Sequence, residues 1–254
     1  MTVTLAALCG FAFIAGFVDA VAGGGGLIQV PALLVLMPQL PIATVFGTNK
    51  FASIWGTGTA AVQYARKVPM EWRVILPAAL SALIFGFLGS MTLSLLRPDA
   101  LRPLIFVLLM IVLVYTIWKK DFGSLHAPKL TPRLQIGAGV LIGAALGFYD
   151  GFFGPGTGSF LIFAFVGVLG FSFLAASAAA KIVNVVTNLA AIAYFSWNGN
   201  ILYGAAMAMA VCNTAGGFLG SHMAIRKGSG FVRSLLVVVV CVLLVRLGYD
   251  FFTN

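Results

Sequence analysis

An internal repeat, set in strongly apolar sequence, restricts the architectures open to this chain. The same pattern of charges and glycines occurs twice, 131 residues apart, so that Asp19 corresponds to Asp150 and Lys50 to Lys181. The pentapeptide Gly-Phe-Leu-Gly-Ser also occurs at 86–90 and again, at the same offset, at 217–221. Several matches at one offset indicate duplication, so we expect two related halves.

The composition points to a membrane protein. Hydrophobic residues make up 61% of the 254 residues and charged residues only 8%, whereas about 25% of a soluble domain is charged. Too few polar residues remain to cover a soluble core, so we predict an all-α, multi-pass protein in the lipid bilayer. The net charge of +9 comes mainly from short loops, where Lys and Arg orient helices in a membrane. We therefore expect no nucleic-acid partner.

About ten apolar segments can be read along the chain. They cover approximately 3–22, 27–38, 43–64, 74–95, 100–118, 134–153, 157–171, 175–196, 201–224 and 231–252. A full span needs about 20 residues, so the second and seventh segments are short. Each of these two follows a glycine-rich break, at 23–26 and at 154–158. We predict that both are short or broken helices.

The loop charges favour ten crossings and an inverted repeat. If every segment crosses, ten basic loop residues fall on one side and two on the other. If the second and seventh segments are re-entrant, the two sides hold seven and five, and neither is clearly cytoplasmic. Five crossings per half force the halves to be inverted, as in many secondary transporters. The predicted parts are a first repeat at 1–118, a polar linker at 119–133 and a second repeat at 134–254.

Lys50 and Lys181 are the main candidates for a binding site. Each lies about seven residues into its segment, or about 10 Å along a helix, where a charge is costly and usually functional. Snorkelling toward the lipid headgroups is the competing explanation. Small polar residues at helical spacing accompany the two lysines, namely Asn49, Ser53 and Thr57 in the first half and Asn184 and Asn188 in the second. A polar stripe ending in a cation suits an oxyanion that sheds its water.

The glycine breaks and two aspartates complete the predicted site. Gly24, Gly25 and Gly156 precede helices whose free N–H groups attract anions, although close helix packing is an equally good reason for these glycines. Asp19 and Asp150 end the first segment of each half. Three roles stay open for them: pairing with the lysines, capping the next helix, or taking up protons during transport. Pairing and capping are favoured over proton uptake.

No residue set suggests catalysis, a metal or another cofactor. The chain has two histidines, and neither lies in an apolar segment beside a matched acid and nucleophile. Cys9, Cys212 and Cys241 show no metal-ligand spacing. The sequence therefore predicts neither an enzyme nor a metalloprotein.

The repeated motifs resemble a known family. The stretches Gly16–Leu34 and Gly47–Ser53, with Gly147–Ile162 and Ala179–Ala191 in the second half, resemble the TauE/SafE sulfite exporter family, also called the four-toluene-sulfonate uptake permease family. Within it the chain looks closest to the YfcA-like branch. The resemblance implies an anion transporter, mostly of bacterial inner membranes, that moves sulfite, thiosulfate, sulfonates or related anions. It also implies that the glycine motifs and the two lysine-bearing helices form the site.

These observations predict a secondary transporter of small sulfur-containing oxyanions, such as sulfite or organosulfonates, in the cell inner membrane. A small anion and the lipid bilayer are the expected partners, and a homodimer stays open. Two alternatives belong to other classes. One is a proton-coupled cation carrier that uses Asp19 and Asp150, and the other is a membrane subunit that transports nothing.

Overall fold

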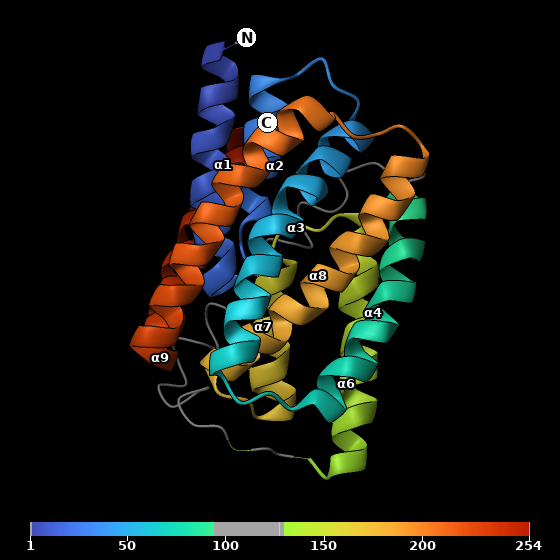
Figure 1. The fold of residues 1–254 in the computed structure, drawn as a ribbon, viewed down its shortest axis with the longest axis vertical. Helices are drawn as coiled ribbons and strands as arrows, with labels where there is room; N and C mark the ends of the chain where they lie inside the picture. Colours follow the sequence, from blue (N-terminus) through green and yellow to red (C-terminus); the bar gives the residue numbers. More distant parts are fainter. Residues whose placement is uncertain (1, 94–126, 128–129, 254) are drawn as a thin grey trace.

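The computed structural model describes residues 2–93, 127 and 130–253, and every element within these ranges is helical. The elements are α1 (Thr2–Ala22), α2 (Gly26–Leu36), α3 (Ile42–Lys67), α4 (Trp72–Thr92), α6 (Pro132–Phe152), α7 (Thr157–Ala164), a π-helix (Phe165–Leu169), α8 (Phe173–Trp197) and α9 (Tyr203–Thr253) (Figure 1). Helix α9 is interrupted at Gly228, where φ is +73° and ψ is −166°. Its two parts match the predicted ninth and tenth segments. The predicted fifth segment and most of the predicted linker lie outside the described residues.

Helix length separates the described elements into two groups. Four helices are long and apolar enough to cross a membrane, namely α1 from Val3 onward, α4, α6 and α8. Helix α2 has 11 residues and α7 has 8, so they are about 16 Å and 12 Å long, against a hydrocarbon core of about 30 Å. The prediction of short second and seventh segments is therefore confirmed.

Corresponding helices of the two halves run in opposite directions along the long axis. Helix α1 starts at the top of Figure 1 and runs down, whereas α6 starts at the bottom and runs up. Helices α3 and α8 show the same reversal. The packing partners exchange in step, because α1 packs on α9 as α6 packs on α4, and α3 packs on α9 as α8 packs on α4. Related segments thus occupy related places in the bundle.

Small residues set the close approach of α4 and α6. Helix α6 carries a glycine at every fourth position from 139 to 151, and these glycines meet Val74, Ala78, Ala82 and Gly86, which have the same spacing on α4. A Cβ atom at Gly147 would lie 2.6 Å from the Cα atom of Ala82. Such small-residue faces let membrane helices pack backbone to backbone, where lipid provides no hydrophobic drive for association.

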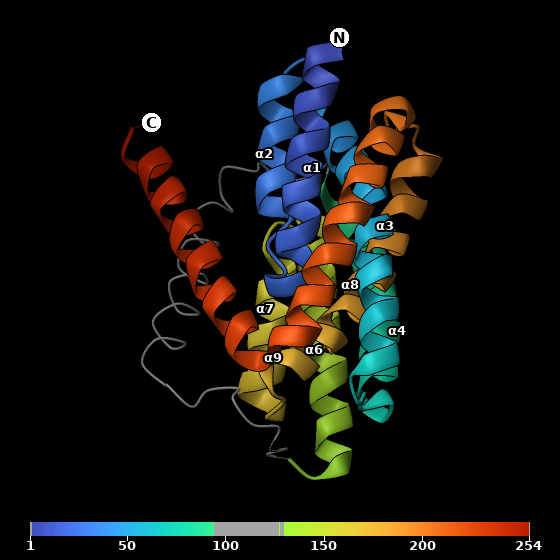
Figure 2. The same ribbon diagram turned by 60° about the vertical axis from the view of Figure 1, so that its left-hand side comes forward.

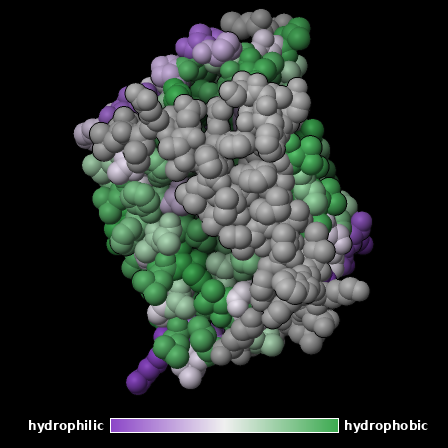
Figure 3. Space-filling model, turned by 180° about the vertical axis from the view of Figure 1, so that it is seen from behind, coloured by the Kyte–Doolittle hydropathy of each residue, from purple (hydrophilic) through white to green (hydrophobic). Residues whose placement is uncertain are grey.

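Large apolar side chains lie on the outside of the bundle. Leu76 and Leu80, one turn apart on α4, are 57% and 61% exposed, and Leu141 on α6 is 72% exposed. Apolar side chains cover most of the coloured surface in Figure 3, and hydrophilic ones lie mainly at its margins. Helices with small residues inside and large apolar residues outside are suited to a lipid environment.

Candidate functional site

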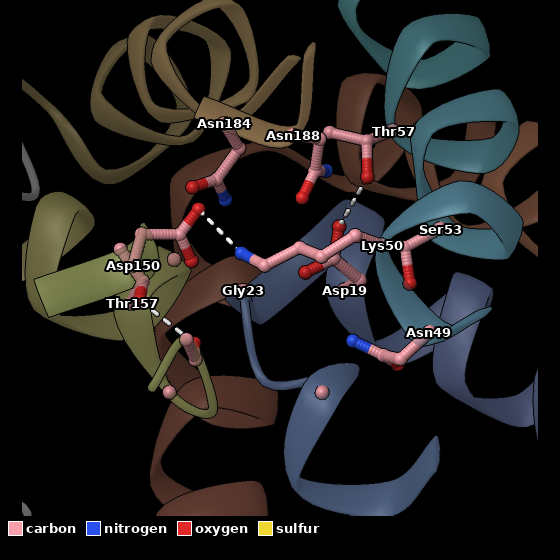
Figure 4. A pocket seen from close by; sticks show the side chains of 14 residues that line it. Asp19, Gly23, Asn49, Lys50, Ser53, Thr57, Asp150, Thr157, Asn184 and Asn188 are labelled. Atoms are coloured by element: carbon pink, nitrogen blue, oxygen red, sulfur yellow. Dashed lines mark hydrogen bonds and ion pairs between the residues drawn. The ribbon is translucent and has the colours of Figure 1, made fainter. Parts of the chain in front are cut away.

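The polar site lies between α3 and α8, the two helices that carry the lysines. On α3, Asn49, Ser53 and Thr57 follow one another at four-residue spacing and share a face, and all three line one cavity. On α8, Asn184 and Asn188 line the same cavity from the opposite side (Figure 4). The structure therefore brings the predicted polar stripes of the two halves together.

Each buried lysine pairs with the aspartate of the other half. Lys50 Nζ lies 2.7 Å from Asp150 Oδ2, and Lys181 Nζ lies 2.9 Å from Asp19 Oδ2. The side chains of Lys50 and Asp150 are 4% and 5% exposed, and those of Lys181 and Asp19 are 0% and 17% exposed. Two ammonium and two carboxylate groups thus leave the site neutral. Burial at this depth excludes snorkelling to the headgroups for both lysines.

The cavity has a volume of about 30 Å³, enough for about two water molecules. Nine predicted site residues line it, namely Asp19, Asn49, Lys50, Ser53, Thr57, Asp150, Gly156, Asn184 and Asn188. In Figure 4, Lys50 extends from α3 across the cavity toward Asp150. The carboxylates are used for pairing rather than helix capping, because the residues that cap α2 and α7 are Gly25 and Gly156.

Three predicted site residues lie outside the cavity lining. Lys181 is fully buried against Asp19 and does not line the cavity. Gly24 and Gly25 are also outside the lining, and they serve packing: a Cβ atom at Gly24 would lie 3.0 Å from Val239, and one at Gly25 would lie 2.7 Å from the Cβ atom of Asp19. Their placement departs from the prediction because the glycine run turns, so that only its two ends face the cavity.

The sequence prediction missed five residues that line the cavity, namely Gly23, Gly26, Gly154, Thr157 and Gly158. All five lie in the two glycine-rich breaks. Gly154 has a φ of +88°, and a Cβ atom there would lie 3.0 Å from Lys50 Nζ. Glycine at this position therefore lets the backbone turn and leaves room for Lys50 to reach Asp150. The related residue of the first half, Gly23, has a φ of +78°, so the matched glycines were the signal available in the sequence.

Two serines of the second half bind the end of α1 and the glycine that follows it, and sequence reasoning did not identify them. Ser159 donates from its Oγ to the carbonyl oxygen of Ala22 at 2.7 Å and from its backbone nitrogen to that of Gly23 at 3.2 Å. Ser177 Oγ donates to the carbonyl oxygen of Val21 at 2.9 Å. These bonds satisfy carbonyl groups that the end of α1 leaves without helical partners.

A second buried polar network, also missed, lies beside the site. Asn213 donates from Nδ2 to Gln29 Oε1 at 3.0 Å and to the carbonyl oxygen of Ala12 at 3.1 Å. Gln29 is fully buried and sits 3.5 Å from the carbonyl oxygen of Asn49. An isolated amide in an apolar stretch was the only signal in the sequence. The network links α2 and α9 to the lysine-bearing helix α3.

The site contains no grouping suited to a metal. Among the described residues, no three His, Cys, Asp or Glu side chains lie close enough together to hold one. The charged groups of the site are two ammonium–carboxylate pairs, surrounded by neutral amides, hydroxyls and backbone groups. This chemistry suits recognition of a small ion by hydrogen bonds and charge.

Comparison with known proteins places this geometry in a family. A sequence model of the family described as "Sulfite exporter TauE/SafE" matches residues 8–247. The probable membrane transporter protein ORF9 of Sinorhizobium sp is 35% identical over 94% of this chain and 90% of its own length. A probable membrane transporter protein of Haemophilus influenzae is 34% identical over 97% and 95%. The probable membrane transporter protein YfcA of Escherichia coli K12 is 31% identical over 94% and 87%.

No solved structure matches the chain. The family and the relatives are described as membrane transporters and not as enzymes, in agreement with the apolar helices and the absence of a catalytic set in the sequence. The family match covers nearly the whole chain, including both lysines and both aspartates. This multi-pass membrane protein therefore belongs to the sulfite exporter TauE/SafE family of membrane transporters.

Proposed function

We propose that this protein is a secondary transporter of small sulfur-containing oxyanions, such as sulfite or organosulfonates, in the cell inner membrane. The observation that carries the proposal is the crossed arrangement of the ion pairs, in which each half supplies the partner of the other half's lysine. Lys50 lines the cavity and is its cationic group, and neighbouring amides and hydroxyls supply neutral hydrogen bonds. The family description supports the substrate class.

The fold we propose is a pair of inverted five-segment repeats that meet at this site. The opposite directions of α1 and α6, and of α3 and α8, support it (Figures 1 and 2), as does the exchange of packing partners between the halves. In transporters built this way, substrate binds at the repeat interface beside interrupted helices, and the halves rock about it. Residues of the breaks before α2 and α7 line the cavity, which supports such a site here.

Substrate entry requires the Lys50–Asp150 pair to separate. The cavity has room for about two water molecules. This space is too small for sulfite or a sulfonate while Lys50 and Asp150 stay in contact. The oxyanion takes the place of the carboxylate on the Lys50 ammonium, and Asn184 and Asn188 face the same space from α8. The ion pair thus keeps the Lys50 ammonium desolvated before the anion arrives. Anion binding then costs little further desolvation of this ammonium, because one anionic partner replaces another.

The test is transport by the purified protein in proteoliposomes loaded with sulfite or thiosulfate. We expect Lys50→Met to reduce affinity or flux about 10- to 100-fold, because a charge-assisted hydrogen bond contributes about 1.5–3 kcal/mol. Lys67→Met is the matched control, since Lys67 is exposed at the end of the same helix and should leave flux unchanged.

The two alternative functions give different results in the same assay. A cation carrier would keep its flux after Lys50→Met and lose it in Asp19→Asn and Asp150→Asn. A subunit that transports nothing would show no flux of any anion or cation, and a cysteine placed at position 184 would not react with water-soluble thiol reagents. Unchanged oxyanion flux and affinity in Lys50→Met would overturn the proposed site.

A further inference from the structure

The two ion pairs differ in their access to the cavity. Lys50 and Asp150 both line it, so a ligand entering the cavity meets both partners of this pair. Lys181 is fully buried and does not line the cavity, so only the carboxylate of the second pair is reached. The Lys50–Asp150 pair is therefore the one that a ligand can open directly.

The two carboxylates also differ in their hydrogen bonds. Asp19 Oδ2 accepts from Lys181 Nζ at 2.9 Å and from Thr57 Oγ1 at 3.1 Å. Asp150 Oδ2 has Lys50 at 2.7 Å but makes no well-aligned hydrogen bond among the described residues. The position related to Thr57 is Asn188, which supplies no such bond to Asp150. Asp19 Oδ2 thus has a hydrogen-bond donor besides its lysine, whereas Asp150 Oδ2 has only Lys50 beside it among the described residues.

Anion binding changes the charge balance of the buried site. The site is neutral with both pairs formed, and a monoanion bound to Lys50 would leave Asp150 as an uncompensated buried charge. Such a charge is expensive in a low-dielectric interior, and a carboxylate avoids it by taking up a proton. Neutrality is restored when one proton joins Asp150 for each monoanion that joins Lys50.

Building on the proposed function, we infer that the coupling ion is the proton and that Asp150 is its acceptor, whereas Asp19 stays ionised. The protein would carry one proton with each monoanion. The charged groups around Asp150 are Lys50 from α3 and, across the cavity, Asp19 from α1. Lys181 of α8 is committed to Asp19, and Tyr149 of α6 donates its hydroxyl to the carbonyl oxygen of Pro155 at 2.8 Å. No cation other than Lys50 faces the freed carboxylate among the described residues that line the cavity.

The experiment measures proton uptake when a fixed-charge anion binds to the purified protein. Methanesulfonate, whose charge does not change near neutral pH, is added to detergent-solubilised protein in weak buffer containing a pH-indicator dye. We expect about one proton to be taken up per anion bound and none in Asp150→Asn. Lys67→Met is the matched control, and it should retain the uptake per bound anion because Lys67 is exposed at the end of α3 and does not line the cavity.

A second measurement needs no variant and covers the case in which Asp150→Asn fails to fold. Uptake of one proton means that the Kd of methanesulfonate for the wild-type protein falls about tenfold for each unit by which pH is lowered. Binding with no proton uptake and a pH-independent Kd would overturn the inference and leave the proposed function standing. Proton release on binding would also overturn it. Failure of methanesulfonate, sulfite and thiosulfate to bind would reject the proposed function and this inference with it.

Discussion

Removal of the fully buried Lys181 tests the energetics of the site most directly. Lys181 is 0% exposed, and its ammonium lies 2.9 Å from Asp19. At an effective dielectric constant of about 20, two charges at this distance attract by about 6 kcal/mol. Desolvation offsets most of this attraction while the pair is intact. In Lys181→Met the attraction is lost, but Asp19 remains buried.

We expect Lys181→Met to lower the free energy of unfolding by about 3 kcal/mol, the lower end of the range for breaking a buried pair. The lower end applies because Asp19 is 17% exposed and keeps the hydrogen bond from Thr57. For a chain of this size, 3 kcal/mol corresponds to about 6–12 °C in Tm. The double variant Lys181→Met/Asp19→Asn removes both charges and should recover at least half of the loss.

The assay is thermal unfolding of the purified variants in detergent, followed by circular dichroism. Lys67→Met is the control, because Lys67 is exposed and its loss should change the unfolding free energy by no more than about 0.5 kcal/mol. The reasoning is wrong if Lys181→Met shifts Tm no more than Lys67→Met does. It is also wrong if the double variant is less stable than the single one.

Two further substitutions, one of them with a matched control, probe the packing around the site. Gly56→Ala would place a Cβ atom 2.5 Å from the carbonyl oxygen of Asn213 and should cost about 1–3 kcal/mol, whereas Gly58→Ala, with no atom within 4 Å, should be neutral or stabilising. Tyr64→Phe removes the hydroxyl that donates to the carbonyl oxygen of Ala20 at 2.9 Å and should cost about 1–2 kcal/mol. The same thermal unfolding measurement checks both, and an unaffected Tm in Gly56→Ala or Tyr64→Phe contradicts the corresponding contact.

Local sequence features were enough to predict most of the described helices and many of the residues that line the cavity. Apolar length gave segments at 74–95 and 175–196, which the structure places at Trp72–Thr92 and Phe173–Trp197. The offset of 131 residues identified the four charged groups of the two ion pairs, namely Asp19, Lys50, Asp150 and Lys181, from the sequence alone. These features are predictable because an ionisable group in a bilayer segment is expensive, and its position repeats when the segment is duplicated.

Partner choice and orientation could not be predicted in the same way. Nothing in the sequence around Lys50 indicates that its carboxylate partner lies in the other half, because that pairing depends on how the halves pack. Lys181 is hidden from the cavity although its counterpart Lys50 lines it, a difference that the repeat in the sequence does not predict. Ser159 and Ser177 were missed for a related reason, since a single hydroxyl in an apolar helix carries no periodic signal.

The two halves differ in the contacts that hold the ends of α1 and α6. At the end of α1, the hydroxyls of Ser159 and Ser177 hold backbone carbonyls across the interface between the halves. The related positions in the first half are Ile28 and Phe46, whose side chains have no donor for the end of α6. There Phe46 lies against Phe153 instead, with ring centroids 5.7 Å apart.

Phe46 therefore meets the end of α6 through an apolar contact, whereas the end of α1 is held to α7 and α8 by hydrogen bonds that contribute about 0.6–2 kcal/mol each within a membrane. In addition, Lys50 and Asp150 both line the cavity. Asp150 lies near the end of α6, just before the second break, so this ion pair is the one at that break. The ion pair whose two partners line the cavity and the apolar contact of Phe46 with Phe153 thus lie at the same break. Since two identical halves would hold these ends in the same way, the substitutions at positions 28/159 and 46/177 make the two breaks unequal.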